Sequence, residues 1–276
     1  MTLLKRTLSY SLTLSSAFAA TYASSEQTTQ NNLIVEFSSP QNTEEEQLKR
    51  EIQNSGVNDT VIDLSNQLFM FEKPLTIQYG GEEGPLYDPQ THQVLIPYSF
   101  YSESLNYFEK NQYEKEYGKT AQTGAIDTLL HTLLHEAGHA YIEDQNIAIL
   151  GKEEDAVDNL ATVLLLNYVE HGGDAAISAA DMFAFESEDR PEYYDLGEYI
   201  DEHSFDLQRY FSTLCLVYGS DPEAYKNLLD EVENDYLKDR KEFCVEHFDV
   251  INANWHRYLK ENDGANGLTL SIGLLQ

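Results

Sequence analysis

The chain has 276 residues, and its 48 Asp and Glu against 17 Lys and Arg give a formal net charge of −31. Apolar residues make up 41% of the sequence, which is enough for a packed core and excludes an acidic, disordered chain. A field this negative repels phosphate backbones and anionic lipids, so the charge argues against nucleic-acid and membrane partners.

The first residues have the order of a secretory signal peptide. Lys5 and Arg6 form a basic start, a short apolar run follows, and small residues then place a cleavage site after Ala19 or Ala23. The run is too short and too polar to act as a stable membrane anchor. We therefore expect a signal peptide over residues 1–19 and a secreted or periplasmic protein.

The next two segments are predicted to be a flexible stretch and then the first helix. Residues 20–42 are rich in Ser, Thr, Gln and Asn and should form a flexible lead-in. A helix is expected over residues 43–56, where Thr43 and Glu46 make a capping box. Helix-compatible apolar spacing continues through residue 70.

Two short strands are expected before residue 100. Residues 75–79 alternate apolar and polar side chains, and residues 93–100 form the second strand, in which Pro97 indicates an edge or a strand end. We expect the two strands to belong to a small antiparallel sheet. The strand around residues 94–98 is the predicted edge for an extended substrate.

The rest of the chain is predicted to be mainly helical. A strong 3.6-residue pattern covers residues 123–145. Further helices are expected over residues 152–170, 173–187, 202–218, 222–234 and 236–261. The simplest description is one α+β domain over residues 43–276, mainly helical with a small antiparallel sheet.

Only two cysteines are present, Cys215 and Cys244. In an oxidising compartment such a pair often forms one disulfide, which would stabilise the fold by about 3–4 kcal/mol. The alternative is two buried free thiols. Neither cysteine has the spacing of a thiolate zinc site.

The helix over residues 123–145 contains the sequence His135-Glu136-Ala137-Gly138-His139. The i, i+4 spacing places His135 and His139 on one helix face, where two imidazoles can bind one ion. Glu136 lies beside that face and can reach a metal-bound water without being a ligand. The pattern predicts a zinc site, and the alternative is two ordinary histidines beside a solvated glutamate.

Glu154 is the candidate third ligand, because it opens the next predicted helix 15 residues after His139. The intervening segment is long enough for the two helices to pack antiparallel. Glu153 and Asp155 are rivals, but they lie about 100° to either side on a helix, so only one of the three should face the ion. Asp158 would accept the second ring N–H of a ligand histidine. Acidic residues also complement a helix start, which is the alternative explanation.

The order of these residues resembles the gluzincin zinc metallopeptidases, in which H-E-x-x-H is followed by E-x-x-x-D on the next helix. The run over residues 135–166 is similar to a bacterial family of metallopeptidases named as a domain of unknown function. Features at residues 201–209, Cys215, 218–222, Cys244 and Trp255 resemble the same family.

The resemblance covers roughly residues 35–262 and implies a minimal zincin-like metallopeptidase fold. It implies one Zn²⁺ ion with His135, His139 and Glu154 as ligands, Glu136 as the catalytic acid and base, and Asp158 behind the ligands. It implies a peptide or protein substrate and names none.

The group that stabilises the oxyanion is predicted less directly. His203 is the first candidate, with Tyr98 and Arg209 behind it, although an arginine in so acidic a chain more often forms an internal ion pair. His131 lies one turn before His135 and is expected to pack behind the ligands.

The expected function is a secreted or periplasmic zinc metallopeptidase with Glu136 as general base. The alternatives are a catalytically silent binding protein on this scaffold, a zinc hydrolase of a non-peptide amide, and a salt-adapted acidic protein whose motif is accidental.

Overall fold

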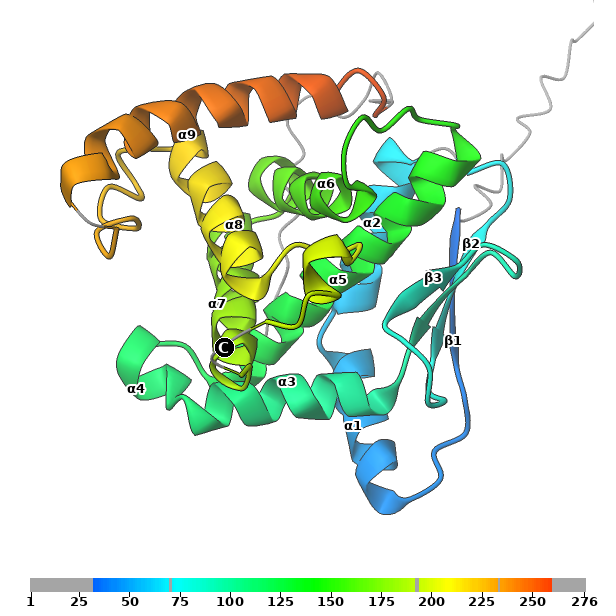
Figure 1. Ribbon diagram of the computed structural model, residues 1–276. Helices are drawn as coiled ribbons and strands as arrows, with labels where there is room; N and C mark the ends of the chain where they lie inside the picture. Colours follow the sequence, from blue (N-terminus) through cyan, green and yellow to red (C-terminus); the bar gives the residue numbers. More distant parts are fainter. Residues whose placement is uncertain (1–31, 70, 192–193, 233, 260–276) are drawn as a thin grey trace, which may run out of the picture. The chain divides into compact units, whose positions relative to one another are not determined.

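A small sheet and a larger set of helices make up the described part of the chain (Figure 1). The structure is a computed structural model, and it describes residues 32–69, 71–191, 194–232 and 234–259. The α+β class expected from the sequence is confirmed, with helices dominant. The predicted signal peptide lies outside the described residues. No helix within these ranges combines the length and the apolar character needed to cross a membrane.

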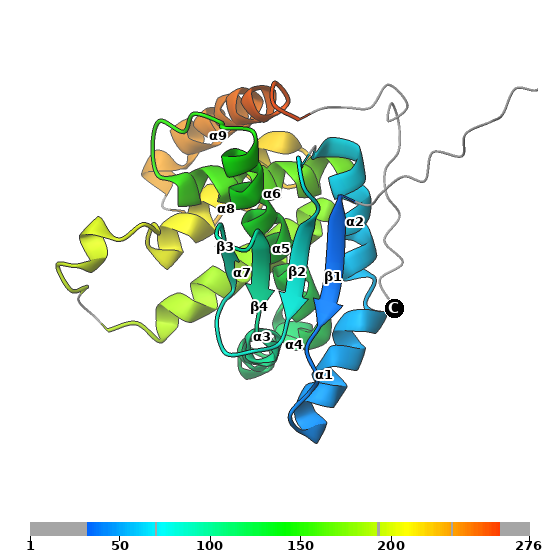
Figure 2. The ribbon, with the colours of Figure 1, turned by 90° about the vertical axis from the view of Figure 1, so that its right-hand side faces the viewer.

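Four strands form one sheet in the order β1-β2-β4-β3 (Figure 2). Their bounds are β1 Leu33–Phe37, β2 Leu75–Tyr79, β3 Leu86–Asp88 and β4 Gln93–Ile96. β1 pairs parallel with β2 and β2 pairs parallel with β4, whereas β3 pairs antiparallel with β4. The sheet is therefore mixed rather than antiparallel as predicted. The chain leaving β2 first runs back as β3, so β4 enters the sheet in the direction of β2.

Gly84 allows the tight return from β2 to β3. Its φ is 110°, and a Cβ at this position would lie 2.2 Å from the carbonyl oxygen of Leu95. Only glycine meets both conditions without strain. The return places β3 at the edge of the sheet and β4 between β2 and β3. The strand around residues 94–98 is thus not the free edge that the sequence predicted, and β3 is.

Strand β1 lies inside the segment predicted to be a flexible lead-in, and that prediction is wrong for residues 33–37. Leu33 is buried and pairs with Leu75, while the ring of Phe37 stacks on that of Tyr79 at 4.7 Å. The polar Ser, Thr, Gln and Asn residues around β1 are typical of a loop. The local sequence does not indicate the strand, because the strand with which it pairs lies about 40 residues further along the chain.

Most of the predicted helices are present, but no helix was predicted over residues 98–110 or 113–117, and residues 98–100 were expected to be part of a strand. The bounds of the helices are α1 Thr43–Asn54, α2 Val57–Leu68, α3 Tyr98–Lys110, α4 Tyr113–Tyr117, α5 Ala121–Asp144, α6 Glu153–Tyr168, α7 Gly172–Glu188, the 3₁₀ helix η1 Glu198–Ile200, α8 Asp206–Ser220 and α9 Asn234–Trp255. The N-cap of α1 is Asn42 rather than Thr43, because the Asn42 side chain accepts from the backbone N–H of Glu45.

One predicted strand is shorter in the structure, and one predicted helix is missing. The strand expected over 93–100 ends at Ile96, and Pro97 then caps α3, so the proline marks a strand end as predicted. The helix expected over 222–234 is absent from the described residues of that segment, which form successive turns. Most of their backbone hydrogen bonds span three residues, as from the N–H of Leu228 to the carbonyl of Tyr225.

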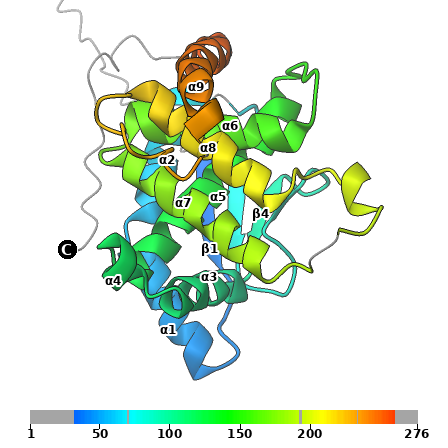
Figure 3. The same cartoon turned by 60° about the vertical axis from the view of Figure 1, so that its left-hand side comes forward.

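Helix α5 packs against both the sheet and several of the other helices. It contacts β3 and β4 on one side and α3, α6 and α7 on others. Helices α7 and α8 lie on the side of α5 away from the sheet (Figure 3). Leu129, Leu133 and Leu134 are fully buried, so α5 is held in the core over its middle turns. The predicted site motif lies in those same turns.

A disulfide joins α8 to α9. Cys215 and Cys244 are bonded, with their Cα atoms 5.0 Å apart and a sequence separation of 29 positions. The predicted pairing is confirmed. The bond closes a loop in the unfolded chain, which lowers the entropy of that state.

We expect reduction of this disulfide to lower the free energy of unfolding by about 3–4 kcal/mol, because the open chain regains loop entropy. Urea denaturation with and without reducing agent measures the effect. The double variant Cys215→Ser, Cys244→Ser is the control, since its midpoint should not respond to the reductant. A wild-type midpoint that is equally insensitive would contradict the prediction.

Candidate metal centre

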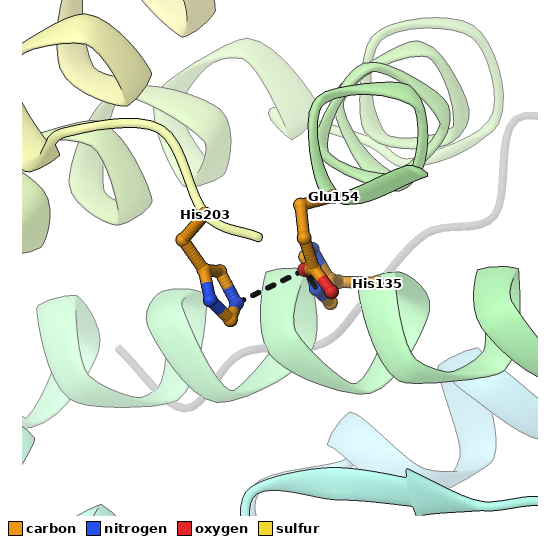
Figure 4. Close-up of side chains that lie close together, drawn as sticks. All are labelled: His135, Glu154 and His203. Atoms are coloured by element: carbon orange, nitrogen blue, oxygen red, sulfur yellow. Dashed lines mark hydrogen bonds and ion pairs between the residues drawn. The ribbon is translucent and has the colours of Figure 1, made fainter. Parts of the chain in front are cut away.

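Three segments meet at one point beside the middle of α5. His135 and His139 come from α5, Glu154 from the first turn of α6, and His203 from the segment before α8. Figure 4 shows the side chains of His135, Glu154 and His203 directed toward one another. Helix α6 crosses α5 rather than lying antiparallel to it as predicted, and the crossing still brings its first turn over the motif (Figure 4).

A close contact between the helices fixes this crossing. Gly138 faces α6, where a Cβ would lie 3.0 Å from Cγ1 of Val157 and 3.3 Å from Leu160. A Cβ at position 138 would require these side chains to shift by a few tenths of an ångström. Val157 lies three residues after Glu154, so both occupy nearly the same face of α6. The contact at Gly138 therefore also brings Glu154 to the histidines.

The donor atoms are spaced as ligands of one small ion would be. The Nε2 atoms of His135 and His139 lie 3.3 Å apart, and the Glu154 carboxylate oxygens lie 3.1 Å and 3.4 Å from them. Tetrahedral Zn²⁺ with bonds of about 2.0–2.1 Å separates its ligand atoms by about 3.3–3.4 Å. The residues present therefore fit a zinc ion.

Only one of the three acidic residues at the start of α6 turns into this cluster. Glu154 points at the imidazoles, whereas Glu153 accepts from Nδ1 of His139 at 2.8 Å and Asp155 is exposed. Burial would raise the pKa of Glu154, but hydrogen bonds from His135, His139 and His203 hold that pKa well below its usual range. Glu154 is thus kept ionised beside the histidines.

His203 was predicted to be an oxyanion donor, and the structure places it in direct contact with Glu154. Its Nε2 lies 3.0 Å from the Glu154 carboxylate, and His135, Glu154 and His203 form a set whose potential ligand atoms lie within 4.8 Å of one another. Lys152 donates to the His203 carbonyl at 2.8 Å, which ties this segment to the start of α6. His203 is therefore a second candidate ligand beside His139.

A buried ion pair orients His135 from behind. Asp158 accepts from Nδ1 of His135 at 2.7 Å, and Arg209 donates to both Asp158 oxygens at 2.7 and 2.8 Å. The Arg209 guanidinium also stacks on the ring of Phe183 at 3.9 Å. Burial would raise the pKa of Asp158, but Arg209 and His135 hold it well below its usual range. This fixes the His135 ring with Nε2 directed at Glu154.

Glu136 occupies a different environment from Glu154. It is buried, and burial is the main cause that raises its pKa, although the backbone of Tyr87 donates to it. Glu136 lines the same cleft as His135 and His139, a cavity of about 780 Å³. Leu86 from β3 and Ile142 from α5 give the cleft an apolar side. A buried carboxyl that lines the cleft beside a candidate metal site is suited to accept and return a proton.

Comparison with known proteins agrees with this chemistry. A family described as "Putative metallopeptidase" matches residues 37–259. The chain belongs to this family. No curated protein and no solved structure matches it. Membership supports peptidase activity and a metal requirement, and within the described residues the set His135, Glu154 and His203 could hold the metal ion.

Three further residues were considered for the site from the sequence, and the structure shows where each one lies. Arg209 forms the internal ion pair that the sequence favoured for it. Tyr98 is not a site residue, because its hydroxyl donates to the Ser38 carbonyl at 3.0 Å beside the sheet. His131 is buried, which lowers its pKa to about 4, and it packs edge-on against Phe183. Its Nε2 has no hydrogen-bond partner among the described residues.

The sequence did not identify β3 as part of the site. Its three residues Leu86, Tyr87 and Asp88 are too few for a periodicity signal, and two prolines flank them. The Tyr87 hydroxyl donates to Glu143 on α5 at 2.6 Å, which holds the strand against the helix. The turn at Asp88-Pro89 was the one signal that could have indicated a short strand before it.

We expect Arg209→Gln to lower the free energy of unfolding by about 3–5 kcal/mol, because the buried Asp158 carboxylate loses its guanidinium partner and keeps, among the described residues, only the hydrogen bond from His135. Metal affinity should also fall by about 10–100-fold, since His135 loses its fixed orientation. Thermal unfolding and competitive titration with a zinc indicator measure the two effects.

Arg50→Gln is the matched control, because Arg50 forms an exposed pair with Glu46 at 3.7 Å that should contribute less than about 1 kcal/mol. If Arg209→Gln were as mild as Arg50→Gln, the orienting role of the ion pair would be wrong.

Proposed function

We propose that this protein is a zinc-dependent peptidase in which His135, His139 and Glu154 hold one Zn²⁺ ion and Glu136 is the general base. The spacing of the three donor groups, 3.1 to 3.4 Å, is the observation that carries the proposal. Two imidazoles and one carboxylate form a common catalytic zinc set, which leaves one position for water or substrate.

The surroundings of the two histidines support their role as ligands. Asp158 accepts from Nδ1 of His135 and Glu153 accepts from Nδ1 of His139. Histidine ligands of zinc commonly donate their second nitrogen to a carboxylate in this manner, which fixes the tautomer and raises the basicity of Nε2. Helix-borne His139 therefore fits the ligand set better than His203, which is half exposed.

The chain's own residues divide the work of peptide hydrolysis. When bound, Zn²⁺ supplies a Lewis acid and lowers the pKa of water. Glu136 takes a proton from the attacking water and returns it to the leaving amine, as its burial beside the histidines suits. His203 faces the cleft and donates a hydrogen bond to the carbonyl oxygen as charge develops there.

The edge of the sheet holds the substrate. Strand β3 pairs with β4 on one side only, and its residues Leu86 and Tyr87 line the cleft. An extended peptide can add to this edge by main-chain hydrogen bonds while its side chains contact the apolar side of the cleft. The disulfide between Cys215 and Cys244 supports an oxidising location, so we propose a secreted or periplasmic enzyme with a peptide or protein substrate.

Glu136→Gln should reduce peptide cleavage by about 10²–10⁴-fold, because the water loses its general base. Zinc content should stay at one ion per chain. A quenched peptide library and elemental analysis measure the two quantities, and Asp155→Asn is the control. Cleavage that survives the substitution would exclude Glu136 as base, and a zinc-bound wild type that cleaves nothing would identify a silent binding protein.

Variants of four residues at the cluster separate the two possible ligand sets. Glu154→Gln and His139→Ala should each weaken zinc binding by more than about 100-fold, whereas Glu153→Gln and His203→Ala should cost about tenfold because these residues only support the site. Competitive titration with a zinc indicator gives the affinities. A larger loss in His203→Ala than in His139→Ala would assign the ion to His135, Glu154 and His203 instead.

A further inference from the structure

A second cavity lies beside the proposed metal centre. It has a volume of about 570 Å³ and is formed by the end of α7, the segment before α8 and the first turn of α8. His203 lines both this cavity and the cleft that contains His135 and Glu136. The volume lies in the range of ligand pockets. A peptide bound in the cleft can therefore place a neighbouring side chain in the second cavity.

The cavity wall carries more negative than positive charge. Its carboxylates are those of Glu186, Asp189, Glu198, Asp201 and Asp206, and its guanidinium groups are those of Arg190 and Arg209. Both guanidinium groups already have partners. Arg209 is bonded to Asp158, and Arg190 contacts Asp206 at 3.0 Å and Glu198 at 3.3 Å. The carboxylates of the cavity wall therefore outnumber its guanidinium groups, and both guanidinium groups are already paired with carboxylates.

Glu186 is the carboxylate that lacks a partner. Its side chain makes no hydrogen bond or ion pair with the residues that the structure describes, although it lies near Arg209 and Arg190. Burial, and then the charge of Asp206, raise the pKa of Glu186 to about 7. Arg209 and Arg190 act in the opposite direction, but neither forms an ion pair with Glu186 among the described residues.

Aromatic rings also line the cavity, and two of them are those of Tyr194 and Phe205. These two rings stack at 4.1 Å, and Tyr199, from outside the lining, packs edge-on against Phe205 at 5.2 Å. Such surfaces cover the alkyl stem of a long basic side chain and attract its charge. An acidic group and an aromatic wall in one cavity are the combination that a lysine or arginine side chain requires.

We propose that this cavity is a specificity subsite for a lysine or arginine side chain of the substrate, with Glu186 as the specificity-determining residue. The inference rests on the proposed peptidase function. Glu186 accepts from the ammonium or guanidinium group, while His203 separates the subsite from the bond that is hydrolysed. Substrates with a basic residue near the cleaved bond are therefore preferred over neutral ones.

Peptide pairs that differ in a single charge test this subsite. N-acetylated peptides with lysine or with Nε-acetyl-lysine near the cleaved bond are compared in wild type, Glu186→Gln and Glu188→Gln. Glu188 is the matched control, because it is exposed on the same helix and does not line the cavity. In wild type kcat/KM should favour lysine by about tenfold or more, since a hydrogen bond to a charged group has this magnitude. Glu186→Gln should abolish the preference, and Glu188→Gln should keep it.

The outcomes separate the subsite from the peptidase activity. If wild type cleaves both peptides equally, the subsite is overturned while the peptidase stands. If wild type cleaves neither, binding of the same peptides is measured by fluorescence anisotropy: tighter binding of the lysine peptide that is lost in Glu186→Gln supports the subsite, and equal binding overturns it. A preference that follows a free N-terminal amine instead of lysine would overturn the side-chain assignment.

Discussion

The contact between α5 and α6 at Gly138 is the constraint on which the site depends. A side chain at this position would meet Val157, so glycine permits the approach. Glu154 and Asp158 lie one turn apart on α6, and the approach brings both to His135, one on each ring nitrogen. One helix contact thus places a carboxylate in the cluster and another behind it.

Charge compensation then assigns a different role to each buried acid. Asp158 faces Arg209 and Glu154 faces imidazoles, and both have lowered pKa values. Glu136 and Glu186 lack a comparable cation, and burial raises the pKa of each. Carboxyl groups with different surroundings can therefore have different roles in one site. An ionised carboxylate can orient a neighbouring side chain, whereas a carboxyl with a raised pKa can carry a proton or accept a cation. In a chain with a net charge of −31, the few buried cations are therefore decisive.

Local sequence patterns predicted most of the helices and the candidate metal-binding residues on α5 and α6. The 3.6-residue period predicted α5 and α6, and the i, i+4 spacing placed His135 and His139 on one face. Helix geometry predicted that only one of Glu153, Glu154 and Asp155 would face the ion. The resemblance selected Glu154, and this choice agrees with where the three side chains point. The pairing of Cys215 with Cys244 followed from their being the only two cysteines. These inferences succeeded because each depends on residues within one or two turns, or on a set with a single solution.

Contacts between distant segments were decided only by the tertiary structure. The parallel pairing of Leu33 with Leu75 and the ion pair of Arg209 with Asp158 each join residues about 40 to 50 positions apart. No local period records such a contact, because its free energy comes from burial and charge pairing that exist only after the chain has folded. For the same reason the sequence could name His203 as a candidate but could not place it beside Glu154, and it could not show that Glu186 lines a cavity without a partner.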